Sequence, residues 1–177
     1  MASMAPLREG KGSPYEGGFR VPLIVRWPGR VKAGSVCDAP VHTIDFYPTF
    51  NEIAGAKAPA GHKLDGESLV PLLEQRGRLR RDAIFWYCPT YTLMYGRTPS
   101  SWVRQGDWKL IHWYGDYLDP AGHTPDDLPY GKLVLGPRTE LYNLKDDIGE
   151  KNDLAASNPA KVAELRTRLE AWWKETG

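Results

Sequence analysis

Residues 101–114 read SWVRQGDWKLIHWY, and this stretch decides the fold of the chain. It contains two runs, Ser101–Arg104 and Trp108–Tyr114, in which aromatic and β-branched residues are frequent, a composition typical of strands. Gly106 and Asp107 stand between the runs and favour a tight turn. The stretch therefore predicts an antiparallel hairpin.

Further strands and one helix are predicted around this hairpin. Short apolar runs predict strands over residues 83–87, 132–135 and 140–142. Residues 116–131 are rich in Asp, Pro and Gly and predict a surface loop.

Near the carboxyl end, Asn158 can cap a helix that has Pro159 in its first turn. The helix has an apolar stripe formed by Val162, Leu165, Leu169 and Trp172. The stripe can pack on one face of the sheet, so the predicted fold class is α+β, a small antiparallel β-sheet packed against a C-terminal helix.

The first part of the chain has a different pattern. Residues 1–18 predict a loop, and Arg20–Trp27 is a short apolar run that predicts a buried strand. Apolar residues then recur at helical spacing from Ile44 to Ala54, with Thr43 or Asp45 as the cap. A strand followed by a helix is typical of an α/β domain, but one such unit cannot bury both faces of a strand.

We therefore predict two domains. Residues 1–75 would be the tail end of an α/β domain, a strand-helix remnant, and residues 76–177 the antiparallel-sheet subdomain with its terminal helix. The charged run at residues 76–81 predicts a solvated linker rather than a phosphate-binding patch.

Composition excludes some classes of function. The 177 residues carry a formal charge of +1, which gives no electrostatic case for a nucleic-acid or membrane partner. No apolar run is long enough to span a bilayer, and the amino terminus lacks a signal-peptide pattern. Cys37 and Cys88 have no metal-ligand spacing and are expected to be buried apolar residues. The aromatic content of 11% predicts a β-rich core or a surface that another domain covers.

Several motifs resemble one family in their order and spacing. Residues 7–22 read LREGKGSPYEGGFRVP, which is similar to a GKGS/T segment followed by EGG-x-R-x-P in sulfatases. Residues 139–154 read TELYNLKDDIGEKNDL and resemble the ELYNL-x-x-DPxE-x-x-N-L segment of the same family, with Ile148 in place of the usual proline. Between them, residues 45–49, 54–55 and 65–72 fall in the family's order. The chain thus resembles the carboxy-terminal portion of an arylsulfatase-like enzyme of the alkaline-phosphatase-like superfamily, and the strand-helix remnant would belong to its catalytic domain.

The resemblance implies hydrolysis of sulfate esters. Such enzymes use a formylglycine, made from the first residue of a C/S-x-P-x-R motif, and a calcium ion held by Asp and Asn. The hydrated aldehyde attacks sulfur while the metal and cationic side chains stabilise charge on the sulfate oxygens. This chain contains no C/S-x-P-x-R motif and lacks the family's metal-binding Asp and Asn. We therefore predict no cofactor in this chain and no sulfatase activity from it alone. The family is often periplasmic, lysosomal or secreted, but the sequence leaves the compartment undetermined.

The resemblance places Lys11 at the sulfate, and the residue type suits this contact, since a compact ammonium between two glycines can approach an anion closely. Glu16 and Arg20 are predicted to form a structural ion pair that holds the EGG-x-R turn. Weaker candidates for substrate contact are Trp102, His112 and Trp113 in the predicted strands and Tyr117 in the predicted loop. Packing is the favoured role of the tryptophans, and no metal site is predicted. His42 and His112 are expected to be packed, and His62 and His123 to lie in loops.

Two alternatives to a sulfatase fragment stay open. The aromatic-rich sheet could belong to a non-catalytic module that binds a missing N-terminal domain, another partner or a second copy of the chain. A shortened chain could also have a different hydrolytic activity, although no serine lies in a G-x-S-x-G setting.

Overall fold

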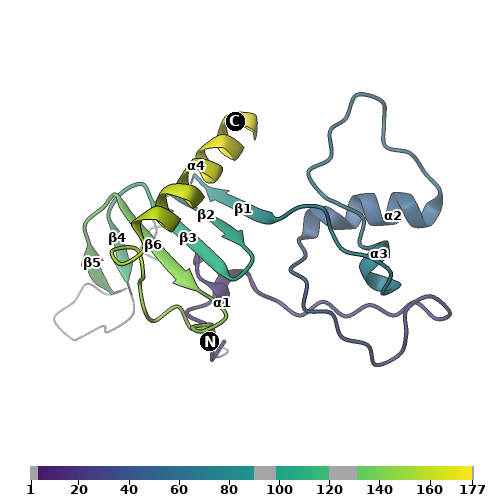
Figure 1. The fold of residues 1–177 in the computed structure, drawn as a ribbon, viewed down its shortest axis with the longest axis horizontal. Coiled ribbons are helices and arrows are strands. Elements are labelled where there is room, and N and C mark those ends of the chain that lie inside the picture. Colours follow the sequence, from purple (N-terminus) through teal and green to yellow (C-terminus); the bar gives the residue numbers. More distant parts are fainter. Residues whose placement is uncertain (1–3, 90–98, 120–130, 177) are drawn as a thin grey trace. The chain divides into compact units, whose positions relative to one another are not determined.

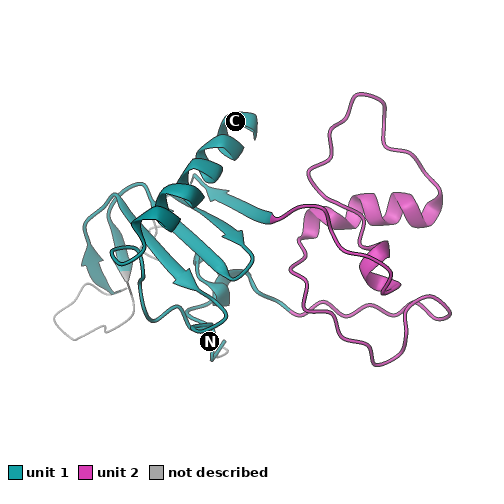
Figure 2. Cartoon of the chain, in the orientation of Figure 1, with its two compact units in different colours: residues 1–21, 83–177 teal, residues 22–82 magenta. Residues whose placement is uncertain are grey.

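The chain divides into two compact units, one of which is built around a four-stranded antiparallel sheet (Figure 1). The structure is a computed structural model that describes residues 4–89, 99–119 and 131–176. The first unit consists of Met1–Val21 and Ala83–Gly177, and the second of Pro22–Asp82 (Figure 2). The beginning of the chain therefore folds with the sheet. The predicted boundary at residue 75 concerns the domains of a complete family member and stays a prediction.

The predicted hairpin lies at the centre of the sheet and is confirmed. The strands β1 (Ala83–Cys88), β2 (Ser100–Gln105), β3 (Trp108–Trp113) and β6 (Arg138–Asn143) follow one another in the order β1-β2-β3-β6. Gln105 is opposite Trp108 across the turn, and Gly106 there has φ of 57°, a conformation that favours glycine. A separate ribbon pairs β4 (Tyr117–Asp119) with β5 (Lys132–Val134).

Two details of this unit correct the sequence analysis. The strand β4 occupies the start of the segment predicted as a loop at residues 116–131, because a strand of this length is too short to show an alternating pattern. Residues 120–130, including His123, lie outside the described residues. Cys37 is exposed and Cys88 is half-buried, so the expectation of two buried cysteines is wrong.

The predicted C-terminal helix is α4 (Pro159–Thr176), and it packs on one face of the sheet. Leu165 and Leu169 are buried in a cluster to which the strands contribute Ala83, Val103, Leu110 and Leu141. Trp172 stacks on Phe85 with ring centroids 5.3 Å apart and an interplanar angle of 6°. The α+β class is thereby confirmed. Within the described residues, no helix combines the length and the apolar character needed to cross a membrane.

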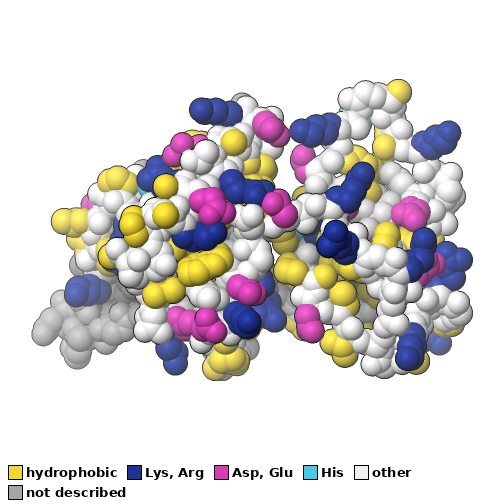
Figure 3. Space-filling view, in the orientation of Figure 1, with side chains coloured by type: hydrophobic (Ala, Val, Ile, Leu, Met, Phe, Trp, Pro, Cys, Tyr) yellow, Lys and Arg dark blue, Asp and Glu magenta, His cyan; other side chains and the backbone are white. Residues whose placement is uncertain are grey.

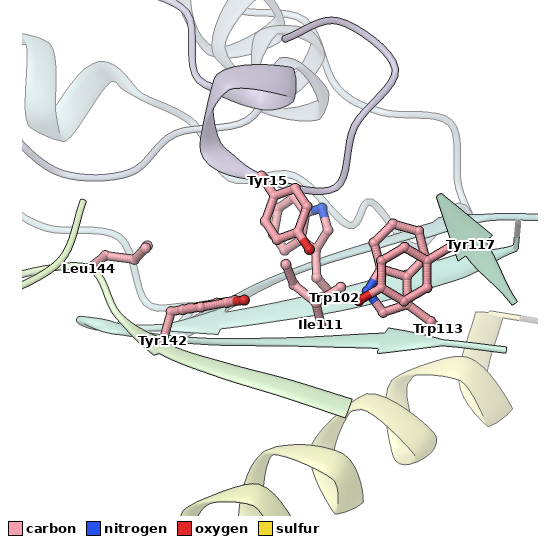
Figure 4. Packing of buried hydrophobic residues seen from close by; sticks show 7 residues of the cluster. All are labelled: Tyr15, Trp102, Ile111, Trp113, Tyr117, Tyr142 and Leu144. Atoms are coloured by element: carbon pink, nitrogen blue, oxygen red, sulfur yellow. The ribbon is translucent and has the colours of Figure 1, made fainter. Parts of the chain in front are cut away.

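The amino-terminal segment covers the opposite face of the sheet. Successive residues of a strand point to opposite faces, so Ile111 and Trp113 of β3 face away from α4. They belong to a buried cluster whose members are Tyr15, Trp102, Ile111, Trp113, Tyr117, Tyr142 and Leu144 (Figure 4). The short helix α1 (Glu16–Phe19) adds Phe19, which lies edge-on to Trp86 and Trp102 at 4.5 and 5.2 Å. The sheet is therefore covered on both faces.

The second unit contains the predicted helix but not the predicted strand. A 3-10 turn, η1 (Thr43–Asp45), leads into α2 (Phe46–Ala54), which ends at Gly55 with φ of 64°, and α3 (Val70–Leu73) follows. Residues 20–27 form no strand, and Ile24 is 90% exposed. A buried strand needs neighbouring strands for its backbone hydrogen bonds, and no residue from 22 to 82 is in a strand. An apolar run by itself is therefore not enough to form a strand.

A buried carboxylate holds the loops of the second unit together. The oxygens of Asp45 accept hydrogen bonds from the backbone N–H groups of His42 and Glu67 at 2.7 and 3.0 Å. Arg81 contacts both oxygens, with Nη2 2.6 Å from Oδ2. Burial opposes the ionised form, but these bonds outweigh it and hold the pKa of Asp45 below its usual value. Because Arg81 is half-buried and paired, the prediction that residues 76–81 are a solvated linker is wrong at this position.

Replacing Asp45 with asparagine should lower the stability of the second unit by roughly 3 kcal/mol, because it leaves the Arg81 guanidinium without its buried partner. Hydrogen–deuterium exchange of peptides covering residues 43–55 measures this change, which appears as faster exchange. The matched control is Asp38→Asn, which changes an exposed side chain of the same unit. Equal exchange in the two variants would contradict the assignment of Asp45 as the residue that holds the loops.

Candidate functional site

Lys11 is exposed on a short loop whose ends are closed by backbone hydrogen bonds. The Gly17 N–H donates to the carbonyl of Arg8 at 3.0 Å, and the Ser13 N–H donates to that of Gly10 at 3.2 Å. The glycine at position 17 makes this closure possible. A Cβ on Gly17 would lie 2.3 Å from the Arg8 carbonyl oxygen, so no larger residue fits there without moving the loop. We call residues 8–18 the Lys11 loop.

Buried charges attach the carboxyl end of the Lys11 loop to the sheet. Glu16 is buried, and its Oε1 lies 2.9 Å from the Nζ of Lys109, a residue of β3 whose side chain is fully buried. The Glu16 Oε2 also accepts a hydrogen bond from Arg104 of β2 at 3.3 Å. The second carboxylate at Lys109 is Glu150, whose Oε1 lies 2.9 Å from Nζ. The loop is therefore fixed to the middle of the sheet by ion pairs away from water.

This arrangement corrects the predicted ion pair between Glu16 and Arg20. In the structure Arg20 is exposed, and its backbone N–H donates to the Glu16 carbonyl at 2.8 Å, closing α1. The carboxylate of Glu16 points instead to Lys109 and Arg104. The nearest cation in the sequence is thus not the partner, because Arg20 leaves the helix in an extended conformation and is exposed, whereas Glu16 is buried against the sheet.

Glu140 of β6 forms a second buried anchor, shared by hydroxyl groups from three elements. Tyr15 and Tyr142 donate to its Oε2 at 2.8 and 2.9 Å, and Tyr117 donates to its Oε1 at 2.5 Å. Burial, reinforced by the charge of Glu140, raises the pKa of Tyr15 and of Tyr142 well above the usual value. These hydroxyls therefore stay protonated and remain donors to the carboxylate.

Arg8 attaches the amino end of the Lys11 loop to the same cluster. Its guanidinium lies over the Tyr15 ring, 3.8 Å from the centroid. Its Nη1 donates to the Tyr142 hydroxyl at 3.2 Å and to the backbone carbonyl of Glu150 at 2.8 Å. Both ends of the loop are thus bound to β3, β6 and the turn at Glu150, and Lys11 projects from between them.

The weaker candidates for substrate contact are largely buried. Trp113 and Tyr117 stack with ring centroids 3.9 Å apart and an interplanar angle of 5°. The Nδ1 of His112 lies 2.8 Å from the Thr139 Oγ1, and burial together with the charge of Arg166 lowers the pKa of His112. These contacts show that the three side chains pack inside the first unit. Their contact with substrate stays a prediction.

Sequence reasoning missed Lys109, Glu140 and Glu150. Lys109 did carry a signal, since it is a charged residue inside the apolar run WKLIHW, on the face of the strand that it shares with Ile111 and Trp113. Glu140 and Glu150 lie in the ELYNL segment that carried the family resemblance. Their contacts with the Lys11 loop depend on tertiary packing, for which the sequence carries no local signal.

An open pocket of about 460 Å³ lies beside the start of the Lys11 loop. It is lined by Pro6, Leu7, Arg8, Arg138, Glu140, Tyr142, Gly149, Glu150, Lys151 and Asp153. Arg138 in this pocket is paired with a carboxylate, since its Nη2 lies 2.9 Å from the Oδ2 of Asp153. In the part of the chain that the structure describes, no group of three or more His, Cys, Asp or Glu side chains is arranged to hold a metal ion.

Comparison with known proteins agrees with this architecture. The family model described as "N-sulphoglucosamine sulphohydrolase, C-terminal" matches residues 10–119. A sulfatase of Formosa agariphila is 37% identical over 95% of this chain, and the steryl-sulfatase of Homo sapiens is 42% identical over 92%. The chain spans 29% of the length of each of these relatives.

A solved structure is similar over almost the whole chain. It is described as Ps i-CgsB in complex with k-i-k-neocarrahexaose, and the likeness has a TM-score of 0.71 at 31% sequence identity. It covers 97% of this chain and 32% of that one.

The stability of the first unit should depend on the ionisation of Glu150. Burial raises the pKa of Glu150, although Lys109 and the Glu16 N–H oppose the shift. A raised folded-state pKa means that the folded state binds the proton more tightly than the unfolded chain does. The stability that the protonation of Glu150 contributes is therefore fully present below the ordinary glutamate pKa. It is lost as the pH rises through the pKa that Glu150 has in the folded state.

We expect the stability of the native chain relative to Glu150→Gln to rise as pH falls from about 7 to about 5, because only the native chain can take up this proton. Urea unfolding followed by tryptophan fluorescence measures the difference at each pH. Glu170→Gln, on the exposed side of α4, is the control. If the stability of the native chain relative to Glu150→Gln falls as the pH is lowered, the pKa of Glu150 is lower, not higher, in the folded state.

Proposed function

The chain belongs to the sulfatase family, and from this premise we propose that it is the part of a sulfatase that presents Lys11 to the sulfate group of a sulfate ester. The ammonium group would stabilise negative charge on the sulfate oxygens as the ester bond breaks. The observation that carries the proposal is the Lys11 loop itself, which exposes one cation and is anchored at both ends by buried residues.

The anchoring matters because charge stabilisation is most effective when the charged group is already in place. A lysine side chain is flexible, so its ammonium is well positioned only if the backbone beneath it is fixed. The bonds of Arg8 and Glu16 fix that backbone against the sheet. The loop can therefore hold a cation toward an anion with little reorganisation.

The nucleophile and the metal are proposed to come from elsewhere. The family uses a formylglycine and a calcium ion, which together supply the attacking hydrated aldehyde and the charge that polarises the sulfate. The sequence has no C/S-x-P-x-R motif, and the described residues offer no metal-ligand cluster, so neither group fits this chain. We propose that the chain has no sulfatase activity alone and acts together with a sulfatase catalytic domain.

The second unit supplies a surface suited to such a partner. The apolar side of α2 is open to solvent, with Tyr47, Phe50 and Ile53 each about half exposed or more. Figure 3 shows hydrophobic side chains among charged ones on the visible face of this unit. Exposed apolar surface of this kind typically marks an interface. A catalytic domain is the proposed occupant, and a second copy of the chain is the alternative when that domain is absent.

Replacing Lys11 with alanine in the longest reading frame that contains this chain should lower kcat/KM for 4-nitrophenyl sulfate by ~10²–10³, the usual cost of losing one preorganised charge-stabilising group. Lys11→Arg should retain part of the activity, and the exposed Lys145→Ala should retain all of it.

The 177-residue chain alone should show no turnover. Turnover by the isolated chain above its Lys11→Ala variant would overturn the proposal that the nucleophile lies elsewhere. Full activity of the longer Lys11→Ala protein would overturn the role of Lys11.

The isolated chain should also associate through α2. We expect sedimentation at high protein concentration to show dimers or larger species, and Phe50→Asp to shift them toward monomer, because it places a charge at the centre of the apolar face. Val36→Asp is the control, since Val36 is exposed on the same unit outside α2. A compact monomer for the unmodified chain would count against self-association.

A further inference from the structure

We propose that Lys109 and Glu150 form a clamp that positions Lys11, so that Lys109 is a positioning residue for sulfate-ester hydrolysis although it lies inside the sheet. This inference rests on the proposed function of Lys11. We call the two residues the clamp.

Glu150 touches both ends of the Lys11 loop. Its carboxylate accepts the backbone N–H of Glu16 at 2.6 Å, and its backbone carbonyl accepts the side chain of Arg8 at 2.8 Å. Arg8 and Glu16 flank Lys11 on either side in the sequence. One residue therefore sets the separation of the two ends between which Lys11 is held.

The backbone of Glu150 indicates that its side chain is needed. Glu150 has φ of 49°, in the left-handed region that favours glycine, yet it is fully buried and carries a carboxylate. A residue with a side chain persists in such a conformation only when its surroundings determine it. The hydrogen bonds from Glu16 and Arg8 and the ion pair with Lys109 are those surroundings.

Lys109 keeps the clamp closed. Its ammonium lies 2.9 Å from an oxygen of Glu16 and 2.9 Å from an oxygen of Glu150. The Trp102 ring centroid is 5.3 Å away, on the same side of the sheet. Without this cation the two carboxylates would face each other in a dry site, where like charges repel strongly. Lys109 lies on an inner strand of the sheet, opposite Arg104 and Tyr142, so it ties the loop to two neighbouring strands.

The buried charges around Lys109 fix the position of the Lys11 loop more than they stabilise the fold. Arg104 and Lys109 together balance the charges of Glu16 and Glu150. Apolar residues of similar volume could fill the same space at no loss of stability, because burying charges is costly even when they are paired. Apolar residues could not, however, bind the amide of Glu16 and fix the loop.

The test compares Lys109→Met with the exposed-site control Lys145→Met. In the isolated chain, we expect hydrogen–deuterium exchange of residues 8–18 to become faster in Lys109→Met, while α4 and the β2–β3 hairpin keep their protection. In the longer protein assayed with 4-nitrophenyl sulfate, kcat should fall by about 10²-fold with little change in KM, because a displaced cation weakens the transition state more than substrate binding. Lys109→Arg should restore part of kcat.

A second variant covers the case in which Lys109→Met fails to fold. The double variant Lys109→Met with Glu150→Gln removes both charges of the clamp, so no carboxylate is left facing another at this point. We expect it to fold, with fast exchange in residues 8–18 and low kcat. Native exchange of residues 8–18 in whichever variant folds would overturn the clamp. Native kcat with fast exchange would overturn its connection to Lys11.

The two proposals fail in different ways. If Lys11→Ala leaves activity intact while the clamp variants still loosen residues 8–18, the proposed function is wrong and the clamp is only structural. If Lys11→Ala abolishes activity and the clamp variants change neither exchange nor kcat, the proposed function stands and the clamp is wrong.

Discussion

The ion pair between Lys109 and Glu16 is the interaction on which the placement of the Lys11 loop depends. It joins the central strand β3 to the segment that carries Lys11, two parts of the chain that are 93 residues apart. It holds the amino-terminal segment, whose described helix α1 has four residues, against the face of the sheet opposite α4. Tyr15 then completes the cover by reaching Glu140 through its hydroxyl.

Buried carboxylates have the same function in both units. Asp45 collects backbone N–H groups and Arg81 in the second unit, as Glu140 and Glu150 collect donors in the first. The chain has 15 Pro and 18 Gly, and long stretches of it are neither helix nor strand. Such stretches form few of the regular backbone hydrogen bonds of helices and sheets, so their N–H groups need other acceptors. One carboxylate can accept several hydrogen bonds.

The local elements were predictable because their signals are local. The Gly106-Asp107 turn, the Asn158-Pro159 helix start and the stripe of Leu165 and Leu169 follow from residues close together in sequence, and the structure confirms all three elements. The run at residues 20–27 failed for the opposite reason. Its apolar side chains met the composition of a strand, but a strand exists only with a neighbour, and residues 22–82 supply none.

The sequence by itself determined the family, the α+β class and the identity of Lys11 as the residue to examine, since motif order and hydrophobic period are written along the chain. Only the tertiary structure decided what holds Lys11 in place. It paired Glu16 with Lys109 and not with the nearby Arg20, and it brought Glu150 to both ends of the loop. The physical reason is that a buried charge takes its partner from whichever element covers it, and that choice depends on how distant segments pack rather than on their spacing in sequence.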